Sequence, residues 1–466
     1  MAHLHEQFTS PFSWRYGSEE MRAIWSEVYK RQLWRRIWVE IADAQQLAGL
    51  VTSEQVADLR EHIADVDLER SLAIEAEIQH DLMAEVKAFA EQCPVGGRII
   101  HLGATSADIE DNADVIRMRD SLDLLLARLL KLLAVFSDKI ENYADRAVMA
   151  FTHLQPAEPT TLGYRLALYA QDLLEDYQLL EKIRNELRGK GLKGAVGTRA
   201  SYVELLVGTK VSAAELESRV MAALGLLAYP ITAQVYPRRQ DWQVMCSLAG
   251  LAASLYKFAF DVRLLQSPVI GEWREPFGRQ QVGSSAMPFK RNPVQAEKVD
   301  SLGRLVASLV HVVWDNAAHS LLERTLDDSA NRREILPVVF LAVDEMLAVI
   351  HRILEGLEVD VEAVERNLAR FGIFSAVERV LVAATKAGAD RQRIHEHLRE
   401  ESMTAWAALA QGKPNPLVER LSQSGELADY LSRERIRELL DANAYIGDAG
   451  DRARDFALLL RSVVSR

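Results

Sequence analysis

Residues 241–265 read DWQVMCSLAGLAASLYKFAFDVRLL, and this stretch decides the fold. Its apolar positions recur at alternating steps of four and three residues, which is the spacing of a helix packed almost parallel to its neighbours. Small residues between them would let neighbouring helices approach closely. We therefore predict a long helix inside a bundle. The apolar positions are Val244, Leu248, Leu251, Leu255, Phe258, Val262 and Leu265.

Three further stretches show a helical pattern. Residues 122–140 carry one apolar stripe and more apolar residues on flanking faces, which indicates a helix enclosed on several sides. Similar patterns run from about Thr160 to Leu187 and from about Val294 to Leu321, each on the order of 40 Å long. Because one chain cannot cover such helices with its own surface, we expect bundles from several subunits to share a core.

The predicted fold class is all-α, because helix-forming residues dominate and alternating strand patterns are scarce. We divide the chain into three helical regions. The first spans residues 1–104, the second is a central long-helix bundle over 105–356, and the third is a more charged helical region over 357–466.

Composition excludes several classes of protein. The chain has 466 residues, and 55 Lys and Arg against 67 Asp and Glu give a net charge of −12. No global positive field is therefore expected to hold a nucleic acid or an anionic membrane. Cys93 and Cys246 are the only cysteines and form no CxxC pattern, which suits a reducing compartment. No signal segment or uninterrupted membrane span is expected, so we predict a soluble, cytoplasmic protein.

Helical periodicity stops without an ordinary turn at residues 283–293, which read GSSAMPFKRNP. Two prolines, a leading glycine and paired serines predict a mobile loop with exposed N–H groups. Lys290 and Arg291 add positive charge to it. Backbone donors and cations together suit a developing oxyanion. A plain Ser/Pro linker is the alternative, but the eleven-residue string is more specific than such a linker.

That string resembles the signature loop of the fumarase/aspartase superfamily. Three more strings are similar to the adenylosuccinate lyase family within it: HLGATS at 101–106, THLQPAEPTT at 152–161 and ERTLDDSANRR at 323–333. The resemblance implies three helical domains, a twenty-helix core in a homotetramer, and active sites that each draw on three subunits. It also implies cofactor-free anti elimination of fumarate from adenylosuccinate, and from succinyl-aminoimidazole-carboxamide ribotide, in purine nucleotide biosynthesis.

The resemblance assigns catalytic roles to five residues. Ser284 is implied as the general base, and Lys290 with the loop N–H groups would stabilise the doubly charged aci-carboxylate that forms. His153 is implied as the general acid for the departing nitrogen, with Glu297 as its partner. His80 matches a second histidine that helps bind the substrate and orient the acid. A helix-capping or core histidine is the alternative for His80.

Other residues are implied at the substrate. Thr105 and Ser106 match residues that hydrogen-bond the succinyl carboxylates, and the pair could also cap the helix that follows. Further positions that the resemblance places around the substrate are Arg15, Tyr16, Asp81, Thr152, Gln234, Ser285, Asn292 and Lys298.

The segment from Arg324 to Arg333 bears on the identity of the substrate. By resemblance Arg324, Ser329 and Arg333 touch a nucleotide, the last two at its phosphate, where a guanidinium fork and a hydroxyl group suit a phosphate monoester. The alternative is a salt-bridged surface loop in which Asp327 and Asp328 neutralise the arginines.

Two positions depart from the family pattern. Gln79 and Lys298 stand where relatives usually have arginine, and both changes weaken bidentate recognition of anions. We expect unchanged chemistry and a substrate preference that can differ from that of the family.

Two short motifs are not expected to carry chemistry. The segment from Gly189 to Gly194 fits GxGxxG, but it follows a helix without a βαβ unit, so we expect a turn near the active site instead of a dinucleotide site. His395 and His397 have no third ligand nearby in sequence, and we predict no metal.

Two other functions remain open at this stage. A lyase for another N-succinyl compound, such as argininosuccinate, would leave the 324–333 string without a phosphate to bind. A catalytically silent helical scaffold is the other alternative, and the joint presence of Ser284, His153 and Lys290 argues against it.

Overall fold

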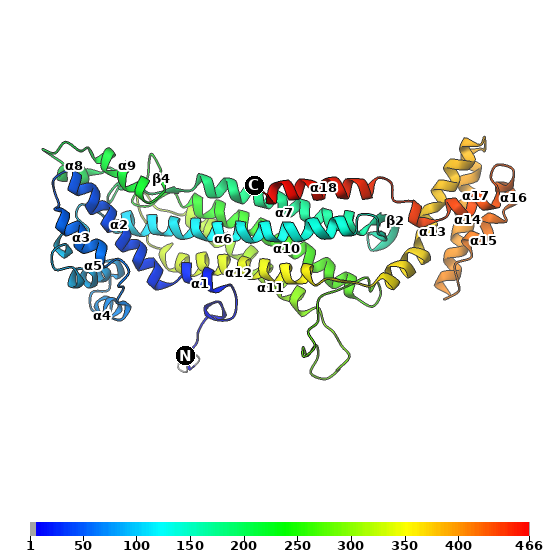
Figure 1. Cartoon of the computed structure of the whole chain (residues 1–466), viewed down its shortest axis with the longest axis horizontal. Coiled ribbons are helices and arrows are strands. Elements are labelled where there is room, and N and C mark those ends of the chain that lie inside the picture. The colour runs from blue at the N-terminus through cyan, green and yellow to red at the C-terminus, as the bar shows by residue number, and fades with distance from the viewer. Residues whose placement is uncertain (1–5, 466) are drawn as a thin grey trace. The chain divides into compact units, whose positions relative to one another are not determined.

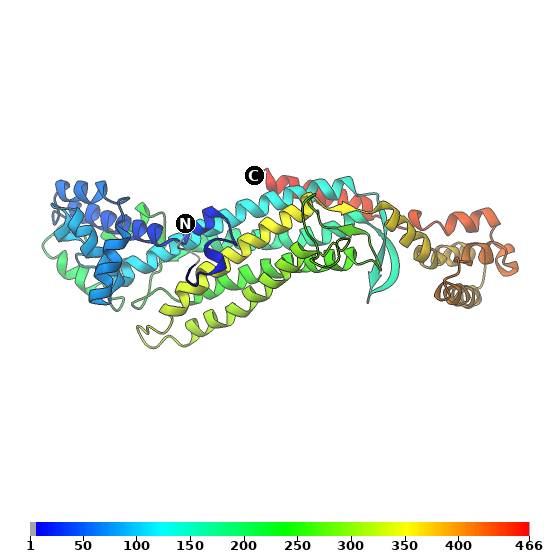
Figure 2. The same ribbon diagram turned by 90° about the horizontal axis from the view of Figure 1, so that it is seen from below.

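A computed structural model describes residues 6–465 of the chain, which form two compact units. Of these residues, unit 1 takes those up to Leu129, with 175–255 and 301–348, and unit 2 takes 130–174, 256–300 and those from Val349 on. Five long helices contribute segments to both units. They are α6 (Ser106–Asn142), α7 (Leu162–Glu186), α10 (Arg239–Gln266), α11 (Val294–Ala318) and α12 (Ser329–Glu355). Figures 1 and 2 draw these helices from two directions.

The helix predicted from residues 241–265 is α10, and its seven apolar positions are at most 5% exposed. The stripe of residues 122–140 lies on α6 and is fully buried. In unit 2, Phe258 of α10 packs edge-on against Phe136 of α6 and Tyr169 of α7, with ring centroids 5.5 and 5.2 Å apart. The all-α fold class is confirmed. The predicted helix over 294–321 is shorter than expected and ends at Ala318.

Polar caps fix the starts of the shorter helices in unit 1. Ser26 Oγ accepts from the Tyr29 N–H at the start of α2 (Glu27–Leu47). Thr52 and Gln55 form a capping box at the start of α3 (Ser53–Glu61). The remaining elements of unit 1 are η2 (Pro11–Ser13), α1 (Glu19–Ile24), α4 (Leu68–Ile78), α5 (Asp81–Gln92), η3 (Gly97–Ile99), α8 (Ala200–Leu205), α9 (Ala213–Ala223), and the parallel pair β3 (Arg188–Gly189) and β4 (Leu227–Ala228).

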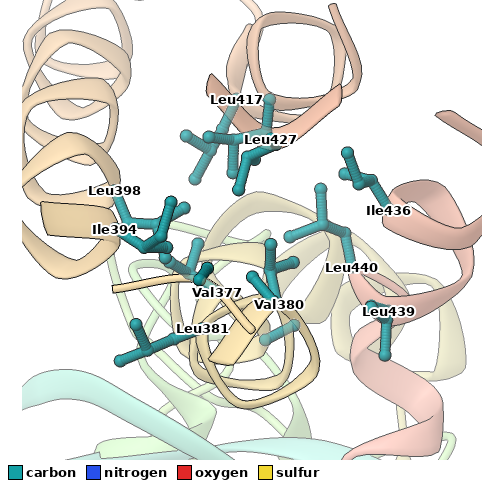
Figure 3. Packing of buried hydrophobic residues seen from close by; sticks show 14 of the residues in the cluster. Val377, Val380, Leu381, Ile394, Leu398, Leu417, Leu427, Ile436, Leu439 and Leu440 are labelled. Atoms are coloured by element: carbon teal, nitrogen blue, oxygen red, sulfur yellow. The ribbon is translucent and has the colours of Figure 1, made fainter. Parts of the chain in front are cut away.

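Helices of the C-terminal region surround an apolar cluster in unit 2, which Figure 3 shows from close by. Val380, Leu417 and Leu427 in this cluster are fully buried. The predicted helical character of this region is confirmed. The elements are α13 (Val361–Lys386), α14 (Arg391–Ala410), α15 (Leu417–Ser422), α16 (Gly425–Ala428), α17 (Arg433–Leu439), η4 (Ala442–Ala444) and α18 (Ala449–Val464).

A β-hairpin that the sequence analysis did not predict precedes the helix α7. β1 (Ala147–Thr152) pairs antiparallel with β2 (Gln155–Thr161), and the base of the hairpin packs on α13 through Met149 and Leu368. The Thr161 hydroxyl accepts from the Tyr164 N–H and so caps α7. A second short antiparallel pair joins β5 (Trp273–Arg274) to β6 (Glu358–Val359).

The predicted limits of the central region lie near the start of α6 and the end of α12. The two compact units divide the chain differently, since they cut through the long helices. The three-domain division therefore stays a prediction.

One helix meets the length and composition criteria for a membrane span, although Lys257 interrupts its apolar run, as the sequence predicts. Among the described helices, α10 alone is long and apolar enough to cross a membrane by length and composition, and 50% of its most apolar window is buried inside the protein. The core helix of a bundle meets the same criteria, because apolar residues cover several of its faces.

Candidate active site

The predicted site residues fall on both units. Unit 1 carries ten of them: Arg15, Tyr16, His80, Asp81, Thr105, Ser106, Gln234, Arg324, Ser329 and Arg333. Unit 2 carries the other eight: Thr152, His153, Ser284, Ser285, Lys290, Asn292, Glu297 and Lys298.

A cavity of about 110 Å³ in unit 1 brings four of the predicted residues together. Ser329 and Arg333 line it from the start of α12, Arg324 from the segment before that helix, and Asp81 from the start of α5. Ser329 is the first residue of α12, so the positive end of a long helix dipole lies beside two guanidinium groups. This combination suits an anionic ligand. We name this space the α12 cavity.

The arginines of the α12 cavity are already paired with carboxylates. Arg333 Nη2 donates to Asp81 Oδ2 at 2.7 Å, and Arg324 Nη1 donates to Asp328 Oδ1 at 2.9 Å. Burial alone would raise the pKa of Asp81, but the Arg333 guanidinium holds it below its ordinary value. The salt-bridge alternative therefore describes Arg324 correctly, whereas Arg333 pairs with a residue 252 positions away in sequence.

A short strap over residues 234–238 ties this segment to α6. The Gln234 N–H donates to the Glu323 carbonyl at 3.0 Å. Arg238 donates to both carboxylate oxygens of Asp111, at 3.1 and 3.2 Å, and to Asp328 at 2.8 Å. Gln234 thus lies beside the 323–333 segment, and Arg238, which lines the α12 cavity, is a residue that the sequence analysis missed.

Several predicted binding residues of unit 1 have local structural roles. Thr105 N–H donates to Asp108 Oδ2 at 3.0 Å where α6 begins, so the Asp108 side chain satisfies this backbone donor, and the expected cap by the hydroxyl groups of Thr105 and Ser106 stays a prediction. His80 caps α5, with its Nδ1 accepting from the Met83 N–H at 3.4 Å. The Arg15 guanidinium lies over the Tyr16 ring, 5.9 Å from its centroid. None of these four predicted residues, nor Ser106 or Gln234, lines the α12 cavity, and their roles at the substrate stay predictions.

In unit 2, His153 is at the tip of the β1–β2 hairpin. His153 and Leu154 have φ angles of 54° and 61°, which form a tight two-residue turn of the kind that matches the twist of a hairpin. Positive φ at two successive non-glycine residues is costly, and such backbone strain is found most often at functional sites. The turn leaves Thr152 and His153 exposed.

The loop predicted from the sequence follows β5 and extends away from the helices of unit 2 (Figure 1). Asn292 Nδ2 donates to the Gly283 carbonyl at 3.0 Å and so closes the loop at its base. The Ser284 hydroxyl accepts from the Met287 N–H at 3.1 Å. A Cβ at Gly283 would overlap the Lys290 carbonyl, so the close approach of the two arms requires glycine here.

Glu297 has a different partner from the one predicted. Glu297 Oε1 lies 3.7 Å from Arg263 Nη2, and Arg263 Nη1 donates to Asp300 at 2.6 Å. Within residues 6–465 of a single chain, no hydrogen bond or ion pair joins His153 to Glu297 or to Ser284. The predicted pairs are therefore not formed inside one chain, and they stay predictions for an assembly in which another copy supplies one partner.

Comparison with known proteins shows the family. A family described as "Lyase" matches residues 15–308, and one described as "Adenylosuccinate lyase C-terminus" matches residues 374–456. Adenylosuccinate lyase of Saccharomyces cerevisiae is 38% identical, over 97% of this chain and 94% of the relative. The protein of that name from Archaeoglobus fulgidus is 35% identical, over 95% and 96% of the two chains.

This chain belongs to the adenylosuccinate lyase family. The predictions of the family and of an enzyme of the carbon–nitrogen lyase class are both confirmed.

Solved structures agree with this fold. The crystal structure of the 3-carboxy-cis,cis-muconate lactonizing enzyme from Pseudomonas putida matches with a TM-score of 0.84 and 28% identity, over 97% of this chain and 99% of that chain. A fumarate lyase from Mesorhizobium sp. BNC1 matches with a TM-score of 0.82 at 23% identity, over 97% and 99%, which shows a shared fold.

The GxGxxG match in this member of the adenylosuccinate lyase family has a structural role that the sequence did not reveal. Lys190 Nζ donates to Asp108 Oδ1 at 2.5 Å, and Lys193 Nζ donates to Glu217 at 2.8 Å, all within the buried part of unit 1. Asp108 is also the acceptor for the Thr105 N–H. The segment therefore supports the turn that carries Thr105. The expectation that no strand and no βαβ unit lies here is wrong, since the segment begins in β3, which pairs parallel with β4 across α8 and α9, although each strand is only two residues long.

The second histidine motif also has a structural partner. His397 Nε2 lies 2.7 Å from the Ser424 hydroxyl, and its Nδ1 lies 3.1 Å from Glu426. Among residues 6–465, no group of three or more potential ligands that could hold a metal ion was found.

Glu275 is another residue of this site that the sequence analysis missed. Its carboxylate accepts from the Gln295 and Ala296 N–H groups at 3.1 and 3.0 Å, and so caps α11 directly behind the loop. Burial raises the pKa of Glu275, and these N–H groups counteract the effect. A lone Glu after Trp273-Arg274 carries no sequence pattern that would predict this cap.

We expect Glu275→Ala to lower the free energy of unfolding by about 1 to 2 kcal/mol, because two helix N–H groups lose their acceptor. Glu275→Gln keeps one acceptor and should lose less. Urea unfolding measures the stability, and hydrogen exchange at residues 295 and 296 locates the change. Equal losses for both variants and for the exposed control Glu355→Ala would contradict the capping role.

Proposed function

We propose that the chain cleaves adenylosuccinate to AMP and fumarate, and succinyl-aminoimidazole-carboxamide ribotide to the corresponding amide and fumarate, in purine nucleotide biosynthesis. The observation that carries this proposal is the α12 cavity, where Arg324, Ser329 and Arg333 gather at a helix N-terminus. Such a site suits a 5′-phosphate, which both substrates contain. Relatives named adenylosuccinate lyase over nearly the whole chain support the same reaction.

In the proposed elimination, Ser284 removes the proton from the carbon next to the one that bears the nitrogen. The electron pair of that C–H bond forms the C=C bond of fumarate as the C–N bond breaks. His153 gives a proton to the departing nitrogen, which leaves as the amino group of AMP. The two groups act from opposite faces of the succinyl moiety, as an anti elimination requires.

The charge that develops on the adjacent carboxylate needs donors that are already in place. Lys290 and the N–H groups of the 283–293 loop are suited to this task, because the loop is exposed and its arms are held together by Asn292. Closure of the loop over the substrate would exclude water and strengthen these interactions. The chemistry needs no cofactor.

We also propose a homotetramer in which each site takes residues from several subunits. Large apolar side chains on the long helices are exposed in the single chain: Leu168 of α7 is 55% exposed, Phe260 of α10 50% and Trp314 of α11 45%. In the loop, Phe289 is 83% exposed. Exposed apolar residues on several helices are typical of surfaces that bind other subunits. We propose a cytoplasmic location, with no nucleic acid or membrane as partner.

An ultraviolet assay of the purified protein with adenylosuccinate, coupled to measurement of fumarate, tests the proposed reaction. We expect fumarate release from both ribotides, and competitive inhibition by AMP. Fumarate release from argininosuccinate without inhibition by AMP would favour the other lyase, and no release from any of these compounds would end the proposal.

The phosphate contact predicts the effect of Arg333→Met. We expect KM for adenylosuccinate and Kd for AMP to rise about 10- to 100-fold with a smaller change in kcat, because an interaction made equally in ground and transition states is lost. Arg333→Lys keeps the positive charge, so its KM and Kd should fall between those of wild type and those of Arg333→Met. The exposed control Arg60→Met should keep the wild-type KM. An unchanged KM in Arg333→Met would contradict a contact between Arg333 and the phosphate.

A further inference from the structure

Glu110 is a carboxyl group in the α12 cavity to which neither the family resemblance nor the proposed mechanism gives a role. It lies on the second turn of α6, four residues after Ser106, so the two share one face of the helix. It lines the same cavity as Arg324, Ser329 and Arg333. Glu110 therefore lies one helical turn after the residues assigned to the succinyl group, and within the space assigned to the phosphate.

The other carboxylates of this cavity are all paired. Glu110 differs from them, since it forms no hydrogen bond or ion pair with any of residues 6–465. The pairs are Glu27 with Lys30 at 2.7 Å, Asp81 with Arg333 at 2.7 Å, Asp111 with Arg238 at 3.1 Å, and Asp114 with Arg332 at 3.3 Å and Arg117 at 3.4 Å.

The charges around Glu110 come from every element that lines the cavity. From α2 come Glu27 and Lys30, from α5 Asp81, from α6 Asp111, Asp114 and Arg117, from the strap Arg238, and from the 324–333 segment Arg324, Arg332 and Arg333. The cations are paired with other acids, and the attraction of Arg333, which lowers the pKa of Glu110, is the smallest of the main effects on this group. Burial, reinforced by Asp81, Asp111 and Asp114, raises the pKa of Glu110 to about 7.

An ionised Glu110 and a phosphate dianion in one small cavity would repel each other. A neutral Glu110 would instead offer an O–H donor to a phosphate oxygen, in a charge-assisted hydrogen bond. Such a donor would matter here because Arg324 and Arg333 are already shared with Asp328 and Asp81.

Given the proposed function, we propose that Glu110 is a specificity-determining residue that binds the phosphate of the nucleotide as a neutral hydrogen-bond donor. Affinity for AMP is then linked to one proton on Glu110. It decreases as the pH rises above the point where this group ionises, although AMP itself stays a dianion there.

Calorimetric titration with AMP between about pH 7 and pH 9 tests this inference. For the wild-type protein we expect Kd to rise with pH towards a limit of about tenfold per pH unit. Glu110→Gln keeps an N–H donor but cannot ionise, so its Kd should stay constant over this range and lie within a few-fold of the wild-type value near pH 7. Glu110→Ala should bind about tenfold more weakly near pH 7, also without pH dependence.

Two controls complete the experiment. Glu61→Gln, an exposed change on α3, should keep the wild-type pH dependence. Adenosine lacks the phosphate, so its Kd should not change with pH, and a dependence equal to that of AMP would overturn the assignment to the phosphate. Thermal unfolding confirms that each variant is folded.

A wild-type Kd for AMP that is flat with pH, or a Glu110→Gln variant that follows the wild-type slope, would overturn the inference while leaving the proposed function intact. Absence of both AMP binding and fumarate release in the wild-type protein would overturn the two together.

Discussion

The Ser284→Ala variant is expected to lose about 1000-fold or more in kcat for adenylosuccinate, because it removes the proposed base. Its stability should change by less than about 0.5 kcal/mol. The Ser284 hydroxyl forms one hydrogen bond, from the Met287 N–H at 3.1 Å, and the loop around it is largely exposed. Steady-state kinetics and thermal unfolding measure the two effects separately.

The matched control for this change is Ser308→Ala, which removes an exposed hydroxyl that donates to the Leu305 carbonyl on α11. The kcat of this control for adenylosuccinate should stay close to that of wild type. Turnover by Ser284→Ala within about tenfold of wild type would remove the base assignment, since general base catalysis contributes at least about 100-fold.

The His153→Asn variant is expected to lose about 100- to 10,000-fold in kcat, because the departing nitrogen would lack its proton donor. Asparagine is chosen because residue 153 has a φ of 54°, which asparagine tolerates better than most residues. The hairpin should therefore keep its turn, so that the loss reports on the imidazole group. Circular dichroism and thermal unfolding check that the fold is kept.

Added imidazole should restore part of the activity of His153→Asn, since a free acid of similar chemistry could then protonate the nitrogen. His319→Gln, which changes a histidine with a 69% exposed side chain, is the control and should be as active as wild type. A kcat of His153→Asn close to wild type would contradict the acid assignment.

The long helices could be predicted because their signal is local and repeated. The apolar positions of α10 from Val244 to Leu265 return to one face of the helix every three or four residues, and all seven side chains are buried. The β1–β2 hairpin gives no such signal, because Pro156 and Pro159 interrupt β2 and no glycine marks the turn. His153 and Leu154 at its tip have positive φ angles, a backbone conformation that histidine and leucine rarely adopt.

The chemistry of the site could be predicted in part from motifs, but the partners of its residues could not. Asp81 and Arg333 are 252 residues apart, and only the fold brings the two together. Glu297 meets Arg263, a pairing that depends on how α10 and α11 lie within unit 2. No sequence motif contains Glu110. It stands out only in the structure, because it has no hydrogen-bond or ion-pair partner among the described residues, whereas the other acids of the α12 cavity have one.

Mixing two inactive variants tests the central claim most directly, which is that His153 of one subunit acts with Ser284 of another. Equal amounts of His153→Asn and Ser284→Ala chains, unfolded and refolded together, should recover up to about a quarter of wild-type activity, because half of the chains supply each intact residue at random. Light scattering and mass spectrometry would establish that mixed oligomers formed. If mixed oligomers form and stay inactive, the two residues do not meet across subunits, and the account is contradicted.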